Sequence, residues 1–336
     1  MRLRRVPARP LRGSAPGAHA CGVHAMPDTP QIPGAVSFFV GTSDVTLHVV
    51  EAGRGPLVLL LHGFPEFSWS WRHQLPALAA AGFRAVAVDL RGCGLSARPR
   101  GLAAYRLSRL AADVDELVGA LGVERAAAIV GHDFGGVVGY RVAARYPQRL
   151  ERLAVLNSPH PAAFARGLLR HAQALRSAYM LPFMLPVLPE RALGALDGAL
   201  LRAALRAFRM APVRDDEIEP YVAMARHAGW LRGGLDMYRA MGQAIGTAVL
   251  ARAPILGRLL APAAPHRGGP ERHRIDAPVL VIWGEEDPFL APHLAEPPRS
   301  LVPNARVERV TGASHDVMLD APERVNALLL DFLRTP

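Results

Sequence analysis

The feature that most constrains how this chain folds is a short apolar segment that runs straight into a glycine-flanked turn. Residues 126–130 read AAAIV, residues 131–136 read GHDFGG, and a helical pattern then continues to Tyr146. Small residues on both sides of Asp133 permit a sharp, strained turn from a buried strand into a helix, which lifts the central side chain above the sheet. The segment therefore predicts an α/β fold with Asp133 at the apex of the turn. A structural turn with a capping aspartate is the alternative.

The remaining pattern agrees with this fold class. We expect strands at residues 45–50, 57–61, 84–89, 126–130, 153–156, 277–283 and 306–310. We expect helices at 71–81, 107–121 and 322–333, and a further helix that ends at Tyr146. Strands that alternate with helices favour a mostly parallel central sheet with helices on both faces. Between Pro159 and about Arg274 only helical periods occur, which predicts an inserted helical cap.

These patterns predict the domain organisation. We expect a tail without regular structure at 1–34, an α/β core at 35–158 and 276–336, and a cap at 159–275 with a long loop near 257–270. The tail lacks the apolar segment that a secretory signal needs. An organellar transit peptide is one alternative, because no acidic residue precedes Asp28, and an upstream start with Met26 as the initiator is another. We assign the tail no function.

Composition excludes several classes of protein. The 336 residues carry a net charge of +10, and because the chain has no lysine, all 39 basic residues are arginine. The arginines are scattered and do not alternate with aromatic residues, so we expect no nucleic-acid partner. No apolar run is long enough for a membrane span. The two cysteines, Cys21 and Cys93, form neither a disulfide framework nor a metal motif. We expect a cytoplasmic protein without a metal or cofactor.

The apex residue narrows the chemistry. A serine at this position would perform acyl transfer, whereas an aspartate can attack an electrophilic carbon and form an alkyl ester. That ester must then be hydrolysed by water that a base activates, and a carboxylate must orient the base. In the chain order typical of this turn, the acid precedes the histidine. His315 follows the strand at 306–310. The motif WGEEDP offers Glu285, Glu286 and Asp287, of which Asp287 lies farthest along its loop.

Two backbone N–H groups are expected to stabilise the oxyanion of the hydrolytic step. One belongs to Phe134, which directly follows the nucleophile at the start of a helix. The other belongs to Phe64 in the motif HGFP, which follows the buried strand at 57–61.

With these motifs the chain resembles the epoxide hydrolases of the α/β-hydrolase fold, over about residues 45–332. The blocks that carry the resemblance are HGFPEFSWSWRHQLPALAAAGFRAVAVDLRGCGLS, GHDFGG, LNSPHP, WGEEDP and GASHD. The resemblance implies a cis peptide between Phe64 and Pro65. It also implies that Tyr179 and Tyr238 in the cap hold the epoxide oxygen and donate a proton to it. The substrates would be an apolar epoxide and water, and the product would be a vicinal diol.

The sequence departs from this family at two site positions. Phe134 stands where the family often has tryptophan, which changes the pocket wall but keeps the backbone donor. Asp316 stands where an aromatic residue often follows the base, so we expect it either to face solvent or to raise the pKa of His315.

Other functions remain open at this point. A hydrolytic dehalogenase of haloalkanes or haloacids would use the same Asp133, His315 and Asp287, but needs N–H donors aimed at the halide. Trp69 and Trp71 are near in sequence, although their positions look structural. A non-catalytic binding protein would lack a member of the triad, and a serine esterase would carry serine at the apex. Both a monomer and a homodimer are compatible with the sequence.

Overall fold

The computed structural model describes residues 30–168, 170–207, 209–210, 214–227, 229–250 and 273–335. Most of the expected tail and the loop expected near 257–270 therefore lie outside the described residues.

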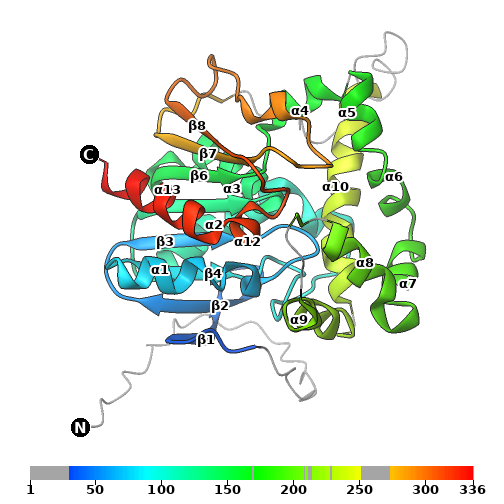
Figure 1. The fold of residues 1–336 in the computed structure, drawn as a ribbon, viewed down its shortest axis with the longest axis horizontal. Coiled ribbons are helices and arrows are strands. Elements are labelled where there is room, and N and C mark those ends of the chain that lie inside the picture. The colour runs from blue at the N-terminus through cyan, green and yellow to red at the C-terminus, as the bar shows by residue number, and fades with distance from the viewer. Residues whose placement is uncertain are drawn as a thin grey trace.

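One eight-stranded sheet organises the chain (Figure 1). The strands, in spatial order, are β1 (Ala35–Gly41), β2 (Thr46–Gly53), β4 (Arg84–Val88), β3 (Leu57–Leu61), β5 (Ala126–His132), β6 (Leu150–Leu156), β7 (Val279–Gly284) and β8 (Ala305–Val310). Strand β2 pairs antiparallel with β1 and β4, and every other pairing is parallel. The predicted mostly parallel sheet is confirmed.

The two faces of the sheet build two separate hydrophobic layers. Strand β3 shows this directly, because Leu57, Leu59 and Leu61 face one layer and Val58 and Leu60 face the other. All five side chains are buried, as expected for a strand covered on both faces.

Helices cover both layers. One face carries α2 (Leu107–Ala120) and α3 (Phe134–Arg145). The other carries α1 (Gln74–Ala80), α12 (Val317–Asp320) and α13 (Pro322–Arg334), which lie in front of the sheet in Figure 1.

Between β6 and β7 the described chain is helical. The elements are α4 (Pro161–Gly167), α5 (His171–Arg176), α6 (Met180–Phe183), α7 (Leu188–Gly194), η4 (Leu196–Gly198), α8 (Ala199–Ala207), α9 (Asp215–Ala225) and α10 (Trp230–Leu250). Figure 1 places α5 to α10 together beside the sheet. None of the described helices is long and apolar enough to cross a membrane.

Polar contacts join these helices to the sheet domain. Arg209 pairs with Asp320 of α12 at 2.8 Å, and both side chains are buried. Gln173 of α5 donates from Nε2 to the carbonyl of Phe289 (2.9 Å) and accepts from the N–H of Ala291 (2.8 Å) at Oε1. Buried polar groups need such partners, so these contacts fix the position of the helices above the sheet.

Some elements differ from expectation. Strand β1 was not expected, because it lies at the sheet edge and its apolar residues do not alternate: Val36 is 63% and Phe39 47% exposed. The helix expected at 71–81 begins only at Gln74, since residues 68–71 form the short 3₁₀ helix η1 (Ser68–Trp71). Trp71, at the end of η1, is fully buried in the core, so packing of this large side chain sets the local backbone.

Candidate active site

The turn after β5 holds Asp133 in a strained backbone conformation, with φ 47° and ψ −117°. A left-handed φ is costly for a residue with a side chain, so the surrounding packing must impose it. That packing requires glycine on both sides. A Cβ on Gly135 would lie 2.1 Å from the carbonyl oxygen of Leu61, and one on Gly131 would lie 2.3 Å from that of Gly135. The predicted turn is therefore present, with Asp133 at its apex.

The loop that follows β3 provides a backbone N–H donor to the carboxyl group of Asp133. The N–H of Phe64 donates to Asp133 Oδ2 at 3.1 Å, and the Phe64–Pro65 peptide is cis, as predicted. The neighbouring N–H of Gly63 is engaged elsewhere, by Glu66 Oε2 at 2.7 Å. Phe134 is the first residue of α3, where a backbone N–H has no partner within the helix. Both predicted oxyanion donors thus lie next to the apex.

The predicted base and acid are in contact. His315 Nδ1 lies 2.8 Å from Asp287 Oδ2. The other Asp287 oxygen, Oδ1, accepts from the N–H groups of Phe289 (2.8 Å) and Leu290 (3.0 Å). Of the three carboxylates in the β7 loop, Asp287 is therefore the one that orients His315. The neighbouring Glu285 instead accepts from the hydroxyl of Thr311.

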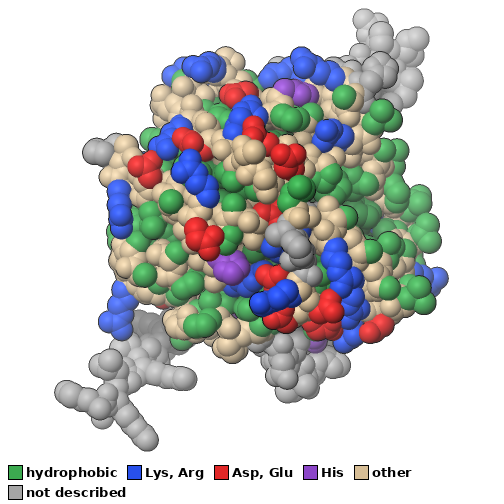
Figure 2. All heavy atoms as spheres, in the orientation of Figure 1, with side chains coloured by type: hydrophobic (Ala, Val, Ile, Leu, Met, Phe, Trp, Pro, Cys, Tyr) green, Lys and Arg blue, Asp and Glu red, His purple; other side chains and the backbone are tan. Residues whose placement is uncertain are grey.

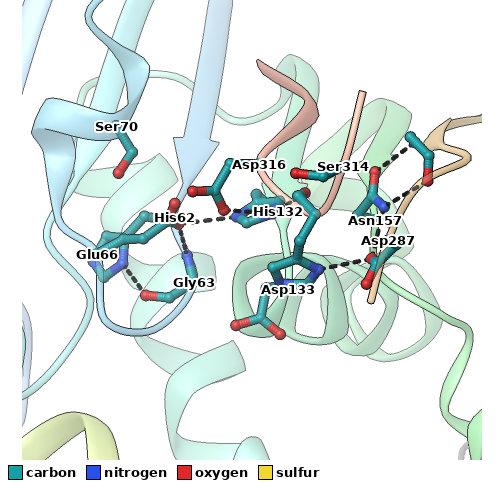
Figure 3. Close-up of polar contacts among 12 residues, drawn as sticks. His62, Gly63, Glu66, Ser70, His132, Asp133, Asn157, Asp287, Ser314 and Asp316 are labelled. Carbon is teal, nitrogen blue, oxygen red and sulfur yellow. Dashed lines mark hydrogen bonds and ion pairs between the residues drawn. The ribbon is translucent and has the colours of Figure 1, made fainter. Parts of the chain in front are cut away.

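Asn157 completes this arrangement and was missed by sequence reasoning. It follows β6 directly, has a left-handed φ of 39°, and donates from Nδ2 to Asp287 Oδ2 at 2.8 Å. Its Oδ1 accepts from the N–H of Gly284 at 2.8 Å, which ties the ends of β6 and β7 together. In Figure 3, Asn157 and Asp287 lie together on one side of the turn that carries Asp133. An asparagine at the carboxyl end of a buried parallel strand was the available signal.

The charges of the site are coupled. Burial lowers the pKa of His315, but Asp287 and Asp133 outweigh it and raise that pKa to about 10. Burial raises the pKa of Asp133, although His315, His132 and the N–H of Phe64 favour its charged form. Burial likewise opposes ionisation of Asp287, but His315 and Asn157 overcome it, so its pKa is lowered. His315 is therefore protonated beside the carboxylate of Asp287, and the carboxyl group of Asp133 adds to the rise of its pKa.

A second histidine lies behind the nucleophile. His132 Nδ1 contacts Glu66 Oε2 and its Nε2 contacts the carbonyl of His315, each at 2.9 Å. Although Glu66 is buried, His132 lowers its pKa to about 2, so it is a carboxylate. Both ring nitrogens of His132 then face acceptors and both must donate, which makes His132 a cation. It links the loop of Phe64 to the loop of His315.

Asp316 lies close to His132 (Figure 3). It is only 5% exposed, so the expectation that it faces solvent is wrong. Its Oδ1 lies 4.0 Å from His132 Nε2. Burial and the charge of Glu66 raise the pKa of Asp316 to about 7. Asp316 is also among the carboxylates that raise the pKa of His315, in agreement with the other alternative.

The two predicted tyrosines meet over the nucleophile. Tyr179, just before α6, and Tyr238, in α10, are joined by a hydrogen bond between their hydroxyls, and the charge of Asp133 acts on both. Burial raises the pKa of each phenol well above its usual value, so both stay protonated. They line a narrow cavity whose remaining walls are Phe64, Pro65, Phe183, Leu193, Leu201, Ala204, Phe289 and His315.

The backbone of α10 lies close to Phe64, and this contact positions Tyr238 of the same helix near Phe64 and Phe134. A Cβ on Gly234 would lie 2.2 Å from the ring of Phe64, so only glycine allows this contact. One turn further along α10, the ring of Tyr238 packs edge-on against Phe134 (4.6 Å between centroids) and Phe64 (5.6 Å). Phenylalanine at position 134 thus serves as a wall for this tyrosine.

The fold and this constellation define an α/β hydrolase. A family model described as the alpha/beta hydrolase fold matches residues 56–322. The chain is 35% identical over 300 residues to AB hydrolase superfamily protein YfhM of Bacillus subtilis, covering 88% of this chain and 97% of that protein. It is 34% identical over 302 residues to Epoxide hydrolase 4 of Mus musculus, covering 87% and 77%.

The structural comparison agrees with the sequence comparison. The crystal structure of an epoxide hydrolase from Bacillus megaterium in complex with an inhibitor superposes with a TM-score of 0.76 at 29% identity, covering 89% of this chain and 100% of that one. The chain therefore belongs to the epoxide hydrolases of the α/β-hydrolase fold.

Proposed function

We propose that this chain, an epoxide hydrolase, acts through a covalent ester on Asp133. In the first step a carboxylate oxygen of Asp133 attacks a ring carbon of the epoxide, and the carbon–oxygen bond of the ring breaks. The electron pair goes to the epoxide oxygen, which takes a proton from Tyr179 or Tyr238. The observation that carries this proposal is that both phenols, His315 and the donor Phe64 surround one cavity beside Asp133.

The second step restores the enzyme. Ester formation removes the charge of Asp133, so the pKa of His315 falls, and His315 can return a proton to the phenolate and become neutral. Neutral His315, oriented by Asp287, then takes a proton from water, and the hydroxide attacks the ester carbonyl carbon. The N–H groups of Phe64 and Phe134 hold the oxyanion. When the ester carbon–oxygen bond breaks, the diol alkoxide takes the proton that the hydroxide carried, and Asp133 is again a carboxylate.

The cavity supports an apolar epoxide as substrate. Apart from the two phenols and His315, its walls are aromatic and aliphatic side chains. No tryptophan of the described chain lines it, and Trp71 is fully buried in the core below the sheet. The described lining therefore offers no indole N–H to a halide. We also propose that residues 159–275 act as the cap, since both phenols lie in this segment.

A substrate panel tests the proposal. Styrene oxide, a long-chain epoxide and a bromoalkane are offered in parallel, and diol and bromide are assayed together. We expect diol and no bromide. Tyr179→Phe and Tyr238→Phe should each slow ester formation by roughly tenfold to a thousandfold, because each removes one donor to the developing alkoxide. Release of bromide without diol, or unchanged rates in both variants, would contradict the proposal.

A further inference from the structure

The cap exposes an unusual amount of apolar surface. Among the described residues, eight of the ten exposed large hydrophobic side chains lie between residues 175 and 210. Six of them, here called the cap patch, come from α6, α7, η4, α8 and the turns between them: Leu181 (71% exposed), Leu185 (48%), Val187 (52%), Leu188 (59%), Leu196 (87%) and Leu200 (51%). Figure 2 shows apolar side chains gathered along the edge of the molecule over α6 to α8. Exposed groups of this kind mark interaction surfaces.

Two of these side chains occupy backbone positions that disfavour them. Val187 has φ 68° and Leu196 has φ 50°. A left-handed φ suits glycine or asparagine, and it is least suited to a β-branched residue such as valine. At both positions the turn therefore displays an aliphatic side chain to solvent where glycine would fold more easily. Folding alone does not account for this choice of residues.

The helices that carry the cap patch also form the wall of the active-site cavity. Phe183 of α6, Leu193 of α7 and Leu201 of α8 line the cavity from the inner side. The same short helices thus present apolar side chains in both directions, with the substrate cavity on one side and solvent on the other. An apolar molecule held at the cap patch would be one layer of helices from the cavity.

This part of the cap carries some arginines without an acidic partner. Residues 161–210 contain seven arginines (Arg166, Arg170, Arg176, Arg191, Arg202, Arg206, Arg209) and two acids. Both acids are paired, Glu190 with Arg239 and Asp197 with Arg226. Three of the arginines are also paired, with acids outside this range: Arg202 with Glu219, Arg206 with Asp215 and Arg209 with Asp320. Arg166, Arg170 and Arg191 are exposed and have no acidic partner among the residues that the structure describes.

Charge decides between the partners that could cover the patch. A second copy of the chain would bring the same arginines against themselves, which disfavours a symmetric contact. An anionic lipid surface offers an apolar layer for the leucines and negative headgroups for the arginines. We propose that the cap patch docks this chain peripherally on anionic phospholipid membranes, from which apolar substrates reach the cavity. The docking itself goes beyond the proposed function, and only the supply of apolar substrates rests on that function.

Vesicle sedimentation tests the docking without any substrate. The full chain is mixed with vesicles of phosphatidylcholine alone, or of phosphatidylcholine with phosphatidylglycerol, and the bound fraction is measured. We expect binding to the anionic vesicles, little binding to phosphatidylcholine, and loss of binding in about 1 M salt, where charges are screened within a few ångströms.

Matched variants assign the binding to the patch. The triple variant L188Q/L196Q/L200Q should bind anionic vesicles at least roughly tenfold more weakly, whereas V36Q/F39Q, which removes exposed apolar side chains from β1, should bind as the parent does. The variant R166Q/R191Q should lose about fivefold per arginine, and R54Q/R145Q, which removes exposed arginines at the opposite end of the strands, should not.

The possible outcomes separate the alternatives. Equal binding of the triple variant and the parent, or no binding of the parent, overturns the proposal. A concentration-dependent dimer in light scattering that disappears in the triple variant also overturns it, because the patch would then join two copies. Diol formation from a small, water-soluble epoxide should be unchanged in the triple variant, since none of its residues lines the cavity. Loss of membrane binding with intact turnover therefore leaves the proposed function standing.

Discussion

Single residues set the order of events in the site through their charge. His315 is held protonated by Asp133 and Asp287, and the pKa of His315 is raised to about 10. A protonated histidine cannot act as a base, so the first step must remove the charge that holds the proton. Ester formation does this, because it converts Asp133 from a carboxylate into a neutral group. In the proposed mechanism, Asp133 thereby controls when His315 can act as a base.

This order predicts that the ester accumulates when the base is lost. His315→Gln keeps a polar side chain beside Asp287 but cannot take a proton from water. We expect the intact mass of this variant to rise by one substrate mass after mixing with epoxide. The double variant D133N/H315Q should show no such rise, since its amide is a poor nucleophile. An unmodified H315Q protein under turnover conditions would count against the mechanism.

The buried charges also predict the pH dependence of ester formation. The pKa of Asp133 is raised by burial, so kcat/KM should fall with decreasing pH at values above the usual range of an aspartate. The two phenols have raised pKa values, so they should cause no loss of rate below about pH 10. A pH profile measured under single-turnover conditions checks both limbs. A decline of kcat/KM between pH 7 and pH 9 would contradict the assignment.

At the scale of the element, the nucleophile depends on how tightly β5 and α3 meet β3. The turn leaves no room for a Cβ at Gly135, where the nearest atom is backbone and cannot move aside. We expect Gly135→Ala to lower the free energy of unfolding by about 2 kcal/mol or more and to displace Asp133. Gly41→Ala is the matched control, because a Cβ there meets nothing within 4 Å. Chemical denaturation measures both, and equal stabilities would contradict the packing argument.

The helices and strands also show which features could be predicted from the sequence and which could not. Strand β3 and the turn at residues 131–136 were predictable because a buried strand must be apolar and the strained turn must have small neighbours. The edge strand β1 and the short helix α12 (Val317–Asp320) gave no period to detect. Asn157 could not be assigned a role, because its contact with Asp287 joins residues 130 positions apart. Tyr179 and Tyr238 came from family resemblance and not from local pattern.

At the scale of the whole molecule, the proposed mechanism requires that the helices between β6 and β7 stay fixed on the sheet domain, so that Tyr179 and Tyr238 remain near Asp133. The buried pair of Arg209 and Asp320 is one such link, and Asp320 Oδ2 also accepts from the N–H of Ser314, next to His315. Asp320→Asn should therefore cost about 3 kcal/mol of unfolding free energy and reduce turnover, because it leaves a buried arginine unpaired. Asp216→Asn, in an exposed pair with Arg214, should leave the stability close to that of the parent, because solvent screens the pair. Equal losses in the two variants would show that the buried pair does not hold the cap.

The central claim is that Asp133, and not water, attacks the epoxide. A single turnover in heavy-oxygen water, with enzyme in excess over styrene oxide, tests it most directly. If the ester forms, the diol keeps an original oxygen of Asp133, and the water oxygen enters the carboxylate. The first turnover should then give unlabelled diol and a heavier peptide 126–141, which trypsin releases between Arg125 and Arg141. Labelled diol with an unlabelled peptide would mean that water attacks directly and would contradict the account.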